Sequence, residues 1–287
     1  MRYFSVTRGG KQRLVASDGD TAYDLSSAPG GPETVSDLLT SGDDDELDLD
    51  ALAERFVDDA ATVSVATDDL AAPVRPPEVW AAGVTYEISE EARQEESDKP
   101  DVYIDVYDSE RPEIFFKATP SRTVGPGDAV GIRSDSTWDT PEPELGVVLY
   151  RGDVVGFTIG NDMSSRSIEG QNPLYLPQAK VYDRCCSLGP CVASLDEVED
   201  PHSLEMRMQI HRDGDIVYDG TTNTDQMVRT CEELASYLLR HNVVPDLTVL
   251  LTGTALVPDD DFTLQEGDEV EIHIEDIGTL RNPVTRV

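Results

Sequence analysis

The sequence EPELGVVLYRGDVVGFTIGND, which spans residues 142–162, contains two apolar runs separated by one short polar segment. Both runs have the composition of β-strands, and residues 151–153 between them include a glycine. This pattern predicts a β-hairpin with a three-residue loop. In this hairpin Tyr150 pairs with Val154, and counting back along both strands places Glu142 opposite Asp162. Because directly opposed residues point to the same face of a sheet, we expect these two carboxylates to lie together.

A third carboxylate joins this pair. Glu144 lies two residues from Glu142 on the same strand and therefore points to the same face. Three neighbouring carboxylates repel one another, and a divalent cation that prefers oxygen ligands, such as Mg²⁺, Mn²⁺ or Ca²⁺, removes that repulsion. The hairpin therefore predicts a metal site. The alternative is a solvated acidic edge, because acidic residues are abundant in this chain.

The segment that follows the hairpin is densely polar. Ser164 and Arg166 come directly after Asp162, and Lys180 is one of only four lysines in the chain. A cation beside a carboxylate cluster binds an acidic substrate, or carries a proton if its pKa is lowered. The alternative is an ordinary surface lysine.

The overall charge of the chain is unusual. It has 58 acidic against 22 basic residues among 287, a formal net charge of -36. Such a charge repels nucleic acids and anionic membranes, so we expect neither as a partner. An acid-rich, lysine-poor chain suits a cytosol of very high salt, where screening removes the self-repulsion. We therefore hypothesise an extremely halophilic source.

The cysteines and the apolar runs indicate the compartment. Cys185, Cys186, Cys191 and Cys231 have no metal-finger spacing, and we expect reduced, buried thiols. The chain has no stretch that resembles a signal peptide and no apolar run of 18 residues. We expect a cytoplasmic protein.

Two domains are expected, a small N-terminal domain over residues 1–72 and a catalytic domain over residues 73–287. In the first domain, strands over 3–7 and 13–16 flank a Gly-Gly turn, and 47–56 has helical periodicity. In the second domain, residues 227–239 predict a helix with a buried apolar stripe, capped by Thr224 or Asp225. The charged residues 87–110 are interpreted as a mobile loop or a lid.

The order of several short motifs resembles the fumarylacetoacetate hydrolase family over about residues 78–287. The motif Glu142-x-Glu144, followed by Gly160-Asn161-Asp162-x-Ser164-x-Arg166, is similar to the metal-binding core of that family. Further matches are Lys180, Leu188-Gly189-Pro190, Leu251-Thr252-Gly253-Thr254, Gly267-Asp268-x-Val270 and Gly278-Thr279-Leu280-x-Asn282-Pro283-Val284. Within the family, residues 169–180 and 82–86 resemble the archaeal 2-keto-3-deoxy-pentonate dehydratases.

The resemblance implies an α+β, mostly β fold with a mixed β-roll catalytic domain, and a Mg²⁺-like ion held by Glu142, Glu144 and Asp162. The sequence departs from the family at one position. Family hydrolases usually have a histidine three residues after the tyrosine of an Asn-Tyr element, whereas Ser89 stands three residues after Tyr86 here. The four histidines all lie farther along the chain and outside the motifs. This difference favours a dehydratase, which needs no water nucleophile.

We therefore expect a metal-dependent lyase that converts a 2-keto-3-deoxy-pentonate, the xylonate or arabinonate derivative, to 2-oxoglutarate semialdehyde. Lys180 or Glu113 is the expected general base, and Lys117 is expected to bind the substrate carboxylate or to pair with Glu113. Thr254 is assigned to substrate binding, and Ser164 and Arg166 to substrate binding or to bracing the metal loop. For Glu113 and Lys117 the alternative is a salt bridge at the pocket edge, and for Thr254 it is an ordinary turn.

Two other functions stay open at this point. One is an acylpyruvate-type C–C bond hydrolase of the same family, and the other is a non-catalytic protein that binds a metal or a sugar acid. By analogy with the family, we expect a homodimer or a homotetramer.

Overall fold

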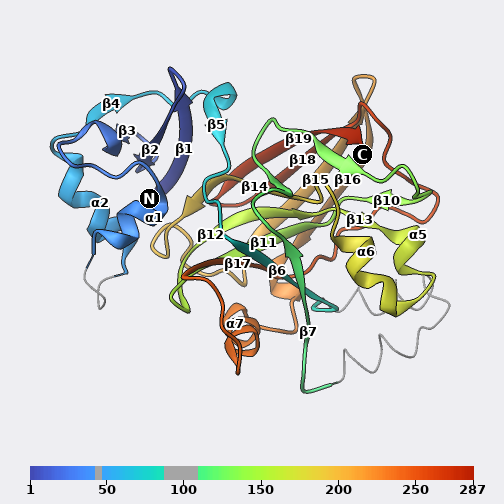
Figure 1. Ribbon diagram of the computed structural model, residues 1–287. Helices are drawn as coiled ribbons and strands as arrows, with labels where there is room; N and C mark the ends of the chain where they lie inside the picture. The colour runs from blue at the N-terminus through green and yellow to red at the C-terminus, as the bar shows by residue number, and fades with distance from the viewer. Residues whose placement is uncertain (43–46, 87–108) are drawn as a thin grey trace.

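The protein is described by a computed structural model that covers residues 1–42, 47–86 and 109–287. The expected loop or lid over 87–110 lies outside these residues, except for its last two. Strands dominate the described chain, as Figure 1 shows, and the mostly β fold expected from the sequence is confirmed. None of the described helices is long and apolar enough to cross a membrane.

The N-terminal unit is a small antiparallel sheet with two helices against it. Strands β1 (Arg2–Arg8) and β2 (Lys11–Ser17) pair around Gly9 and Gly10, which both have positive φ, so the predicted turn is confirmed. Helix α2 (Leu49–Val57) begins two residues later than predicted, because the Asp48 side chain caps it by accepting the amides of Asp50 and Ala51. The other elements of the unit are β3 (Ala22–Asp24), η1 (Leu25–Ser27), α1 (Val35–Thr40), β4 (Ala61–Val63), η2 (Thr67–Asp69) and β5 (Leu70–Ala71).

A large mixed sheet joins this unit to the rest of the chain. Its strand order is β4-β3-β2-β1-β14-β12-β11-β17-β6-β7, with β5 and β8 paired at its sides. The junction is the pairing of β1 with β14, where Tyr3 lies opposite Val192. The added strands are β6 (Glu78–Gly83), β7 (Glu113–Ala118), β8 (Thr123–Val124), β11 (Pro143–Tyr150), β12 (Asp153–Asp162), β14 (Cys186–Ala193) and β17 (Leu247–Leu251). One sheet therefore runs across residue 72, and the division into two domains there stays a proposal.

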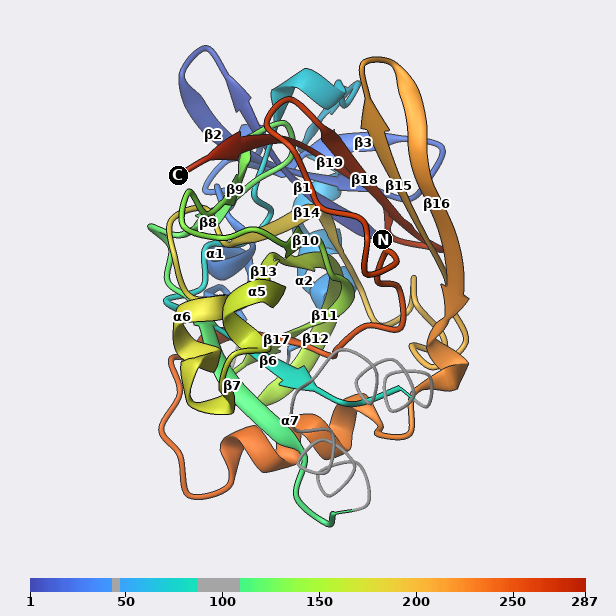
Figure 2. The same ribbon diagram turned by 90° about the vertical axis from the view of Figure 1, so that its right-hand side faces the viewer.

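A second sheet covers the first and completes the roll. Its order is β16-β15-β18-β19-β9, and Figure 2 shows these strands running beside β1 and β14. Alternate residues of β15, such as Met206, Met208 and Ile210, are buried in the core that the two sheets share. The bounds are β9 (Val130–Ile132), β15 (Glu205–Arg212), β16 (Asp215–Asn223), β18 (Glu269–Ile274) and β19 (Gly278–Arg286), with a separate pair of β10 (Asp139–Thr140) and β13 (Ser164–Ser165).

The described residues after residue 72 form few helices, and the predicted helix over 227–239 starts later than expected. Helix α7 (Cys231–Leu239) begins after Thr230, whose hydroxyl accepts the Glu233 amide at 3.1 Å. The predicted caps Thr224 and Asp225 are wrong, because they belong to a separate turn, η4 (Thr224–Gln226), and Met227 after it is extended. The apolar stripe of α7 is buried as predicted. The remaining helices are α5 (Arg166–Glu169), η3 (Pro173–Tyr175) and α6 (Leu176–Lys180).

The hairpin of β11 and β12 has a tighter turn than the sequence predicted. Tyr150 pairs with Asp153 around a two-residue turn, Arg151 and Gly152, both of which have positive φ. The predicted three-residue loop and the Tyr150–Val154 pair are therefore wrong. A β-bulge then adds one residue, Val155, to β12, and this restores the expected register in the rest of the hairpin. The carboxylate end is consequently aligned as predicted.

All four cysteines are free and buried, which confirms the expectation of reduced thiols. Burial raises the pKa of the Cys191 and Cys231 thiols to about 12, so both are protonated and unreactive at neutral pH. They act as small apolar core residues.

Candidate metal centre and active site

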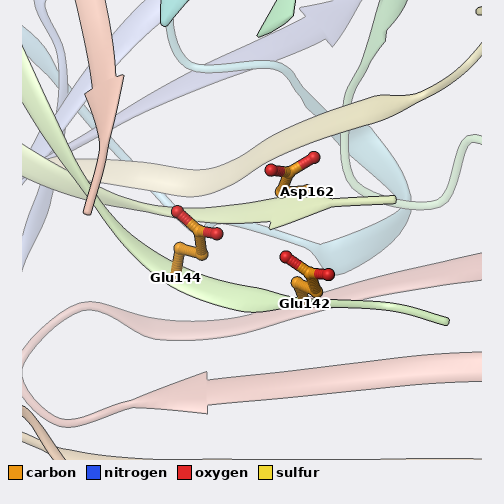
Figure 3. A group of neighbouring side chains, drawn as sticks. All are labelled: Glu142, Glu144 and Asp162. Carbon is orange, nitrogen blue, oxygen red and sulfur yellow. The ribbon is translucent and has the colours of Figure 1, made fainter. Parts of the chain in front are cut away.

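Three carboxylates converge at the end of the central hairpin, as Figure 3 shows. Oxygen atoms of Glu142, Glu144 and Asp162 lie within 4.8 Å of one another. The Asp162 amide donates to the Glu142 carbonyl at 2.9 Å, so hairpin pairing continues to the last residues and holds the two side chains on one face. All three residues are at most 3% exposed. The cluster is therefore buried, which excludes the solvated acidic edge.

The electrostatics of this cluster fit a divalent cation. Burial, together with the neighbouring charges of Asp162 and Glu142, raises the pKa of the Glu144 carboxyl well above its usual value. Among the described residues Glu144 forms no ion pair, and its Oε2 accepts the Gly253 amide at 2.7 Å. Gly253 has a φ of +88°, and a methyl group there would overlap the Thr85 hydroxyl. The ligand atoms are all oxygen, the set that Mg²⁺, Mn²⁺ and Ca²⁺ prefer.

Lys180 lies beside the triad and is almost fully buried, so it is not an ordinary surface lysine. Its Nζ donates to Ser164 Oγ at 2.6 Å, to Glu142 Oε2 at 2.7 Å and to Asp162 Oδ2 at 3.2 Å. These contacts use all three protons of an ammonium group. Burial by itself lowers the pKa of Lys180, but the carboxylates of Asp162 and Glu142 outweigh burial and raise the pKa above its usual value. The side chain is therefore charged at neutral pH.

Lys117 approaches the triad from β7 and is fully buried. Its Nζ lies 2.5 Å from Asp162 Oδ1 and donates to the backbone carbonyls of Met163, at 2.8 Å, and Lys180, at 2.5 Å. Burial, the largest single influence, lowers the pKa of Lys117, whereas Asp162 together with the thiols of Cys185 and Cys186 raises it, with a net increase. Lys117 is thus held behind Asp162.

Arg166 is the third cation of the cluster. Helix α5 places its guanidinium 3.1 Å from Glu142 Oε1 and 3.9 Å from Glu169 Oε2. Arg166 and Glu169 are 7% and 5% exposed. Glu142 therefore lies between Arg166 and Lys180, which restrain both of its oxygens.

A cavity of about 500 Å³ opens above the triad. Its wall includes the predicted residues Glu113, Arg166, Lys180 and Thr254 together with the three carboxylates. The other lining residues are Ala82, Gly83, Val84, Phe115, Glu169, Leu176, Gly253, Ala255, Val257, Pro258, Asp259, Asp260 and Asp261. Within the described parts of the chain this wall contains no histidine. It does not include Lys117 or Ser164 either, and both touch the triad from outside the cavity.

Two further predicted residues have specific neighbours. Glu113 faces Gly83 across the β6–β7 pair, and a methyl group on Gly83 would overlap Glu113 Oε2. The Thr254 hydroxyl accepts the Leu256 amide at 3.1 Å, so Thr254 forms a turn as well as lining the cavity.

The sequence did not single out Glu169, Phe115, Leu176 or the acidic run Asp259, Asp260 and Asp261 as site residues. The spacing of Glu169 from Arg166 was the available signal, because residues three apart meet on a helix. The run at 259–261 gave no such signal, since it belongs to a long connection without periodicity.

Comparisons with known proteins agree with this geometry. Residues 78–285 match the family model described as fumarylacetoacetate hydrolase C-terminal. Over the full length of both chains, the protein is 60% identical to a probable 2-keto-3-deoxyxylonate dehydratase of Haloferax volcanii. A 2-dehydro-3-deoxy-D-arabinonate dehydratase of Saccharolobus solfataricus is 49% identical over 75% of this chain and 74% of its own.

A solved structure of 2-keto-3-deoxy-D-arabinonate dehydratase, complexed with magnesium and 2,5-dioxopentanoate, has the same fold. It superposes with a TM-score of 0.82 and 40% identity, covering 100% of this chain and 99% of that chain. The family model covers the triad and every residue that lines the cavity, and the chain therefore belongs to the fumarylacetoacetate hydrolase family.

Proposed function

We propose that the protein is a magnesium-dependent dehydratase that converts a 2-keto-3-deoxy-pentonate, the xylonate or arabinonate derivative, to 2-oxoglutarate semialdehyde. The observation that carries the proposal is the full-length identity of 60% to a dehydratase of this substrate class. The geometry supports it, because a buried set of oxygen ligands, two cations and a separate carboxylate surround one cavity. The semialdehyde is the 2,5-dioxopentanoate that the solved relative holds with magnesium.

Glu142, Glu144 and Asp162 are the proposed magnesium ligands. When bound, the ion supplies Lewis-acid polarisation of the 2-oxo group, which acidifies the hydrogens on C3. Protein side chains carry out the remaining steps.

Arg166 is the proposed anchor for the substrate carboxylate. Its guanidinium lines the cavity beside Glu142, and guanidinium groups match carboxylates in shape and charge. Thr254 lies on the same wall as Gly253, whose amide holds Glu144, and is the proposed polar contact to the bound acid.

Glu113 is the proposed base that removes the C3 proton. It lines the cavity from β7, and it is not one of the three ligand carboxylates. Lys180 was the other candidate base. Its ammonium protons are all engaged by Glu142, Asp162 and Ser164, and a protonated amine cannot accept another proton. We therefore propose Lys180 as the acid that donates a proton to the departing C4 hydroxyl, with Glu142 and Asp162 restraining its position.

The proposed reaction conserves its atoms. Loss of the C3 proton and of the C4 hydroxyl as water leaves a C3–C4 double bond conjugated to the 2-oxo group. A proton then leaves C5 and one is added to C3, which gives an enol with a C4–C5 double bond. The enol hydroxyl loses its proton as C4 gains one, and C5 becomes an aldehyde. Water is the only by-product, and no oxidant is needed.

Lys117 and Ser164 are proposed as positioning residues rather than as residues that bind substrate. Lys117 fixes one oxygen of Asp162. The Ser164 hydroxyl accepts a hydrogen bond from Lys180 and donates one to the Asp162 carbonyl at 3.0 Å. Contacts of this kind orient metal ligands from behind.

The test is an assay in molar KCl with Mg²⁺ and 2-keto-3-deoxy-xylonate or 2-keto-3-deoxy-arabinonate, with the semialdehyde measured by NMR. We expect stoichiometric semialdehyde, and none after the metal is removed with EDTA. If the protein releases no water from either acid but cleaves an acylpyruvate, it is a hydrolase. If it turns over neither class but binds Mg²⁺, it is a binding protein.

We also propose that the enzyme works in the cytoplasm as a homodimer or homotetramer. The support is family membership and the exposure of Leu174 and Tyr175, at 83% and 41%, next to the active-site helix α6. Light scattering after size exclusion in molar KCl measures the mass, and a single 31.4 kDa species would contradict the oligomer.

A further inference from the structure

The connection between β17 and β18 is fixed at both ends. At its start the Gly253 amide is bound to Glu144. Near its end the Leu264 amide donates to the Asp139 carbonyl at 3.0 Å, and the Arg212 guanidinium lies 5.4 Å from the centre of the Phe262 ring. Arg212 also donates to the Thr263 carbonyl at 3.0 Å. The residues between these anchors are therefore held at a defined place on the cavity wall.

Three consecutive aspartates of that stretch lie on the cavity wall. Asp259, Asp260 and Asp261 line the cavity and are exposed, whereas the metal triad at its floor is buried. They consequently form the solvent-facing rim. In the described part of the chain none of the three has an ion-pair partner, so their charge acts on whatever enters.

The cations of the cavity lie on other elements. Arg166 and Lys180 belong to α5 and α6, and both contact Glu142. In Figure 2 the yellow helices and the red-orange connection after β17 lie on different sides of β11 and β12. A ligand in this cavity thus meets positive charge beside the floor and only negative charge at the rim segment.

We propose that the rim segment Asp259, Asp260 and Asp261 determines specificity by accepting an uncharged, hydroxylated end of the ligand and rejecting a second carboxylate. The inference rests on the proposed function, since it concerns the outer end of the same oxo acid. With its carboxylate and 2-oxo group at the floor, a five-carbon acid directs C5 toward the rim. Carboxylate oxygens accept hydrogen bonds from hydroxyl groups, whereas they repel a C5 carboxylate.

Two ligands of equal length test this proposal by binding alone. Both 5-hydroxy-2-oxopentanoate and 2-oxoglutarate have five carbons and a 2-oxo acid end, and they differ in a C5 alcohol or carboxylate. Isothermal titration of the Mg²⁺-loaded protein at 0.1 M KCl should give an affinity about tenfold higher for the alcohol. In molar KCl, where the screening length falls to about 3 Å, the ratio should fall below about threefold.

The variant D259N/D260N/D261N should bring the ratio at 0.1 M KCl close to one, chiefly by strengthening 2-oxoglutarate binding. The single variant D260N, as a milder change, should lower the ratio part of the way. The matched control D58N/D59N/D68N removes the same charge from exposed residues of the N-terminal unit and should keep the wild-type ratio.

Equal affinities in the wild-type protein, or an unchanged ratio in the triple variant, would overturn the proposal, as would failure of both ligands to bind. The dehydration assay tests the proposed function independently of this binding measurement. Turnover without discrimination would reject the rim segment and leave the dehydratase standing, whereas discrimination without turnover would reject the dehydratase and leave the rim segment standing.

Discussion

Two acidic regions of this protein border the same cavity and differ in almost every other respect. The triad of Glu142, Glu144 and Asp162 is buried and held by Lys180, Arg166, Lys117 and the Gly253 amide. The rim segment at 259–261 is exposed and has no ion pair within the described residues. The same side-chain chemistry is therefore suited to metal binding where burial and cations organise it, whereas exposed carboxylates give only a screened electrostatic field.

The largest effect on activity should follow from removing one carboxylate of the triad. Glu144→Ala removes one of the three proposed ligands, and Lewis-acid stabilisation by a metal is worth several kcal/mol, so we expect activity to fall at least about 10⁴-fold. Steady-state assays with saturating Mg²⁺ measure this loss. Activity within tenfold of wild type would show that the reaction does not depend on metal binding by the triad.

Removing the cation behind the triad should cost stability. Lys117→Met leaves Asp162 Oδ1 and two buried carbonyls without their ammonium partner, and we expect a loss of about 3–5 kcal/mol in the free energy of unfolding. Chemical denaturation in molar KCl gives the value. Lys11→Met, at an exposed position, is the matched control. An equally small change in both variants would show that Lys117 is not needed for the stability of the triad.

Glu113→Gln should lower kcat without disturbing the triad. Loss of a general base costs about 10²-fold or more, whereas the amide keeps the size of the side chain. We expect unchanged Mg²⁺ affinity and a nearly unchanged KM. Gly83→Ala, which crowds the Glu113 carboxylate, should lower kcat by a smaller factor. A normal kcat for Glu113→Gln would show that another residue acts as the general base.

The raised pKa of Glu144 predicts a pH dependence of stability without metal. A carboxyl whose pKa is higher in the folded protein than in the unfolded chain binds its proton more tightly when folded. Wild type should therefore lose stability relative to Glu144→Gln as the pH rises above the unfolded value near 4.5, by at least about 1 kcal/mol up to pH 8. Unfolding in EDTA measures this difference, and Mg²⁺ should reverse it. If the difference in stability between the two proteins does not depend on pH, the raised pKa of Glu144 is contradicted.

Surface acids should give the smallest effect. D58N/D59N/D68N changes exposed side chains, so in molar KCl we expect the free energy of unfolding to move by less than about 0.5 kcal/mol. At low salt the variant should be the more stable protein, because it reduces the net charge of -36. Equal stability of both proteins at low salt would contradict the role given to charge repulsion.

The sequence predicted the carboxylate end of the hairpin better than its turn. Glu142, Glu144 and Asp162 follow from strand periodicity, which survives a local change of loop. The turn was wrong because a two-residue turn plus a β-bulge spans the same number of residues as a three-residue loop with a regular strand. Only backbone conformation distinguishes the two.

Contacts between distant elements were beyond prediction. Lys117 was expected to bind the substrate carboxylate or to pair with Glu113, but the position of β7 relative to β12 and α6 places its ammonium behind Asp162. The rim segment was missed because a long connection has no periodicity that would indicate which wall it reaches. The family motifs did predict the fold and the grouping of Glu142, Glu144 and Asp162, since they fix the order of the elements that carry them.

The most direct test of the central claim is a crystal structure with Mn²⁺ in place of Mg²⁺, recorded at a wavelength where manganese scatters anomalously. We predict one strong peak per chain, within about 2.0–2.4 Å of oxygens from Glu142, Glu144 and Asp162, the range of oxygen contacts for such cations. A peak at another group of residues, or none at saturating Mn²⁺, would contradict the account.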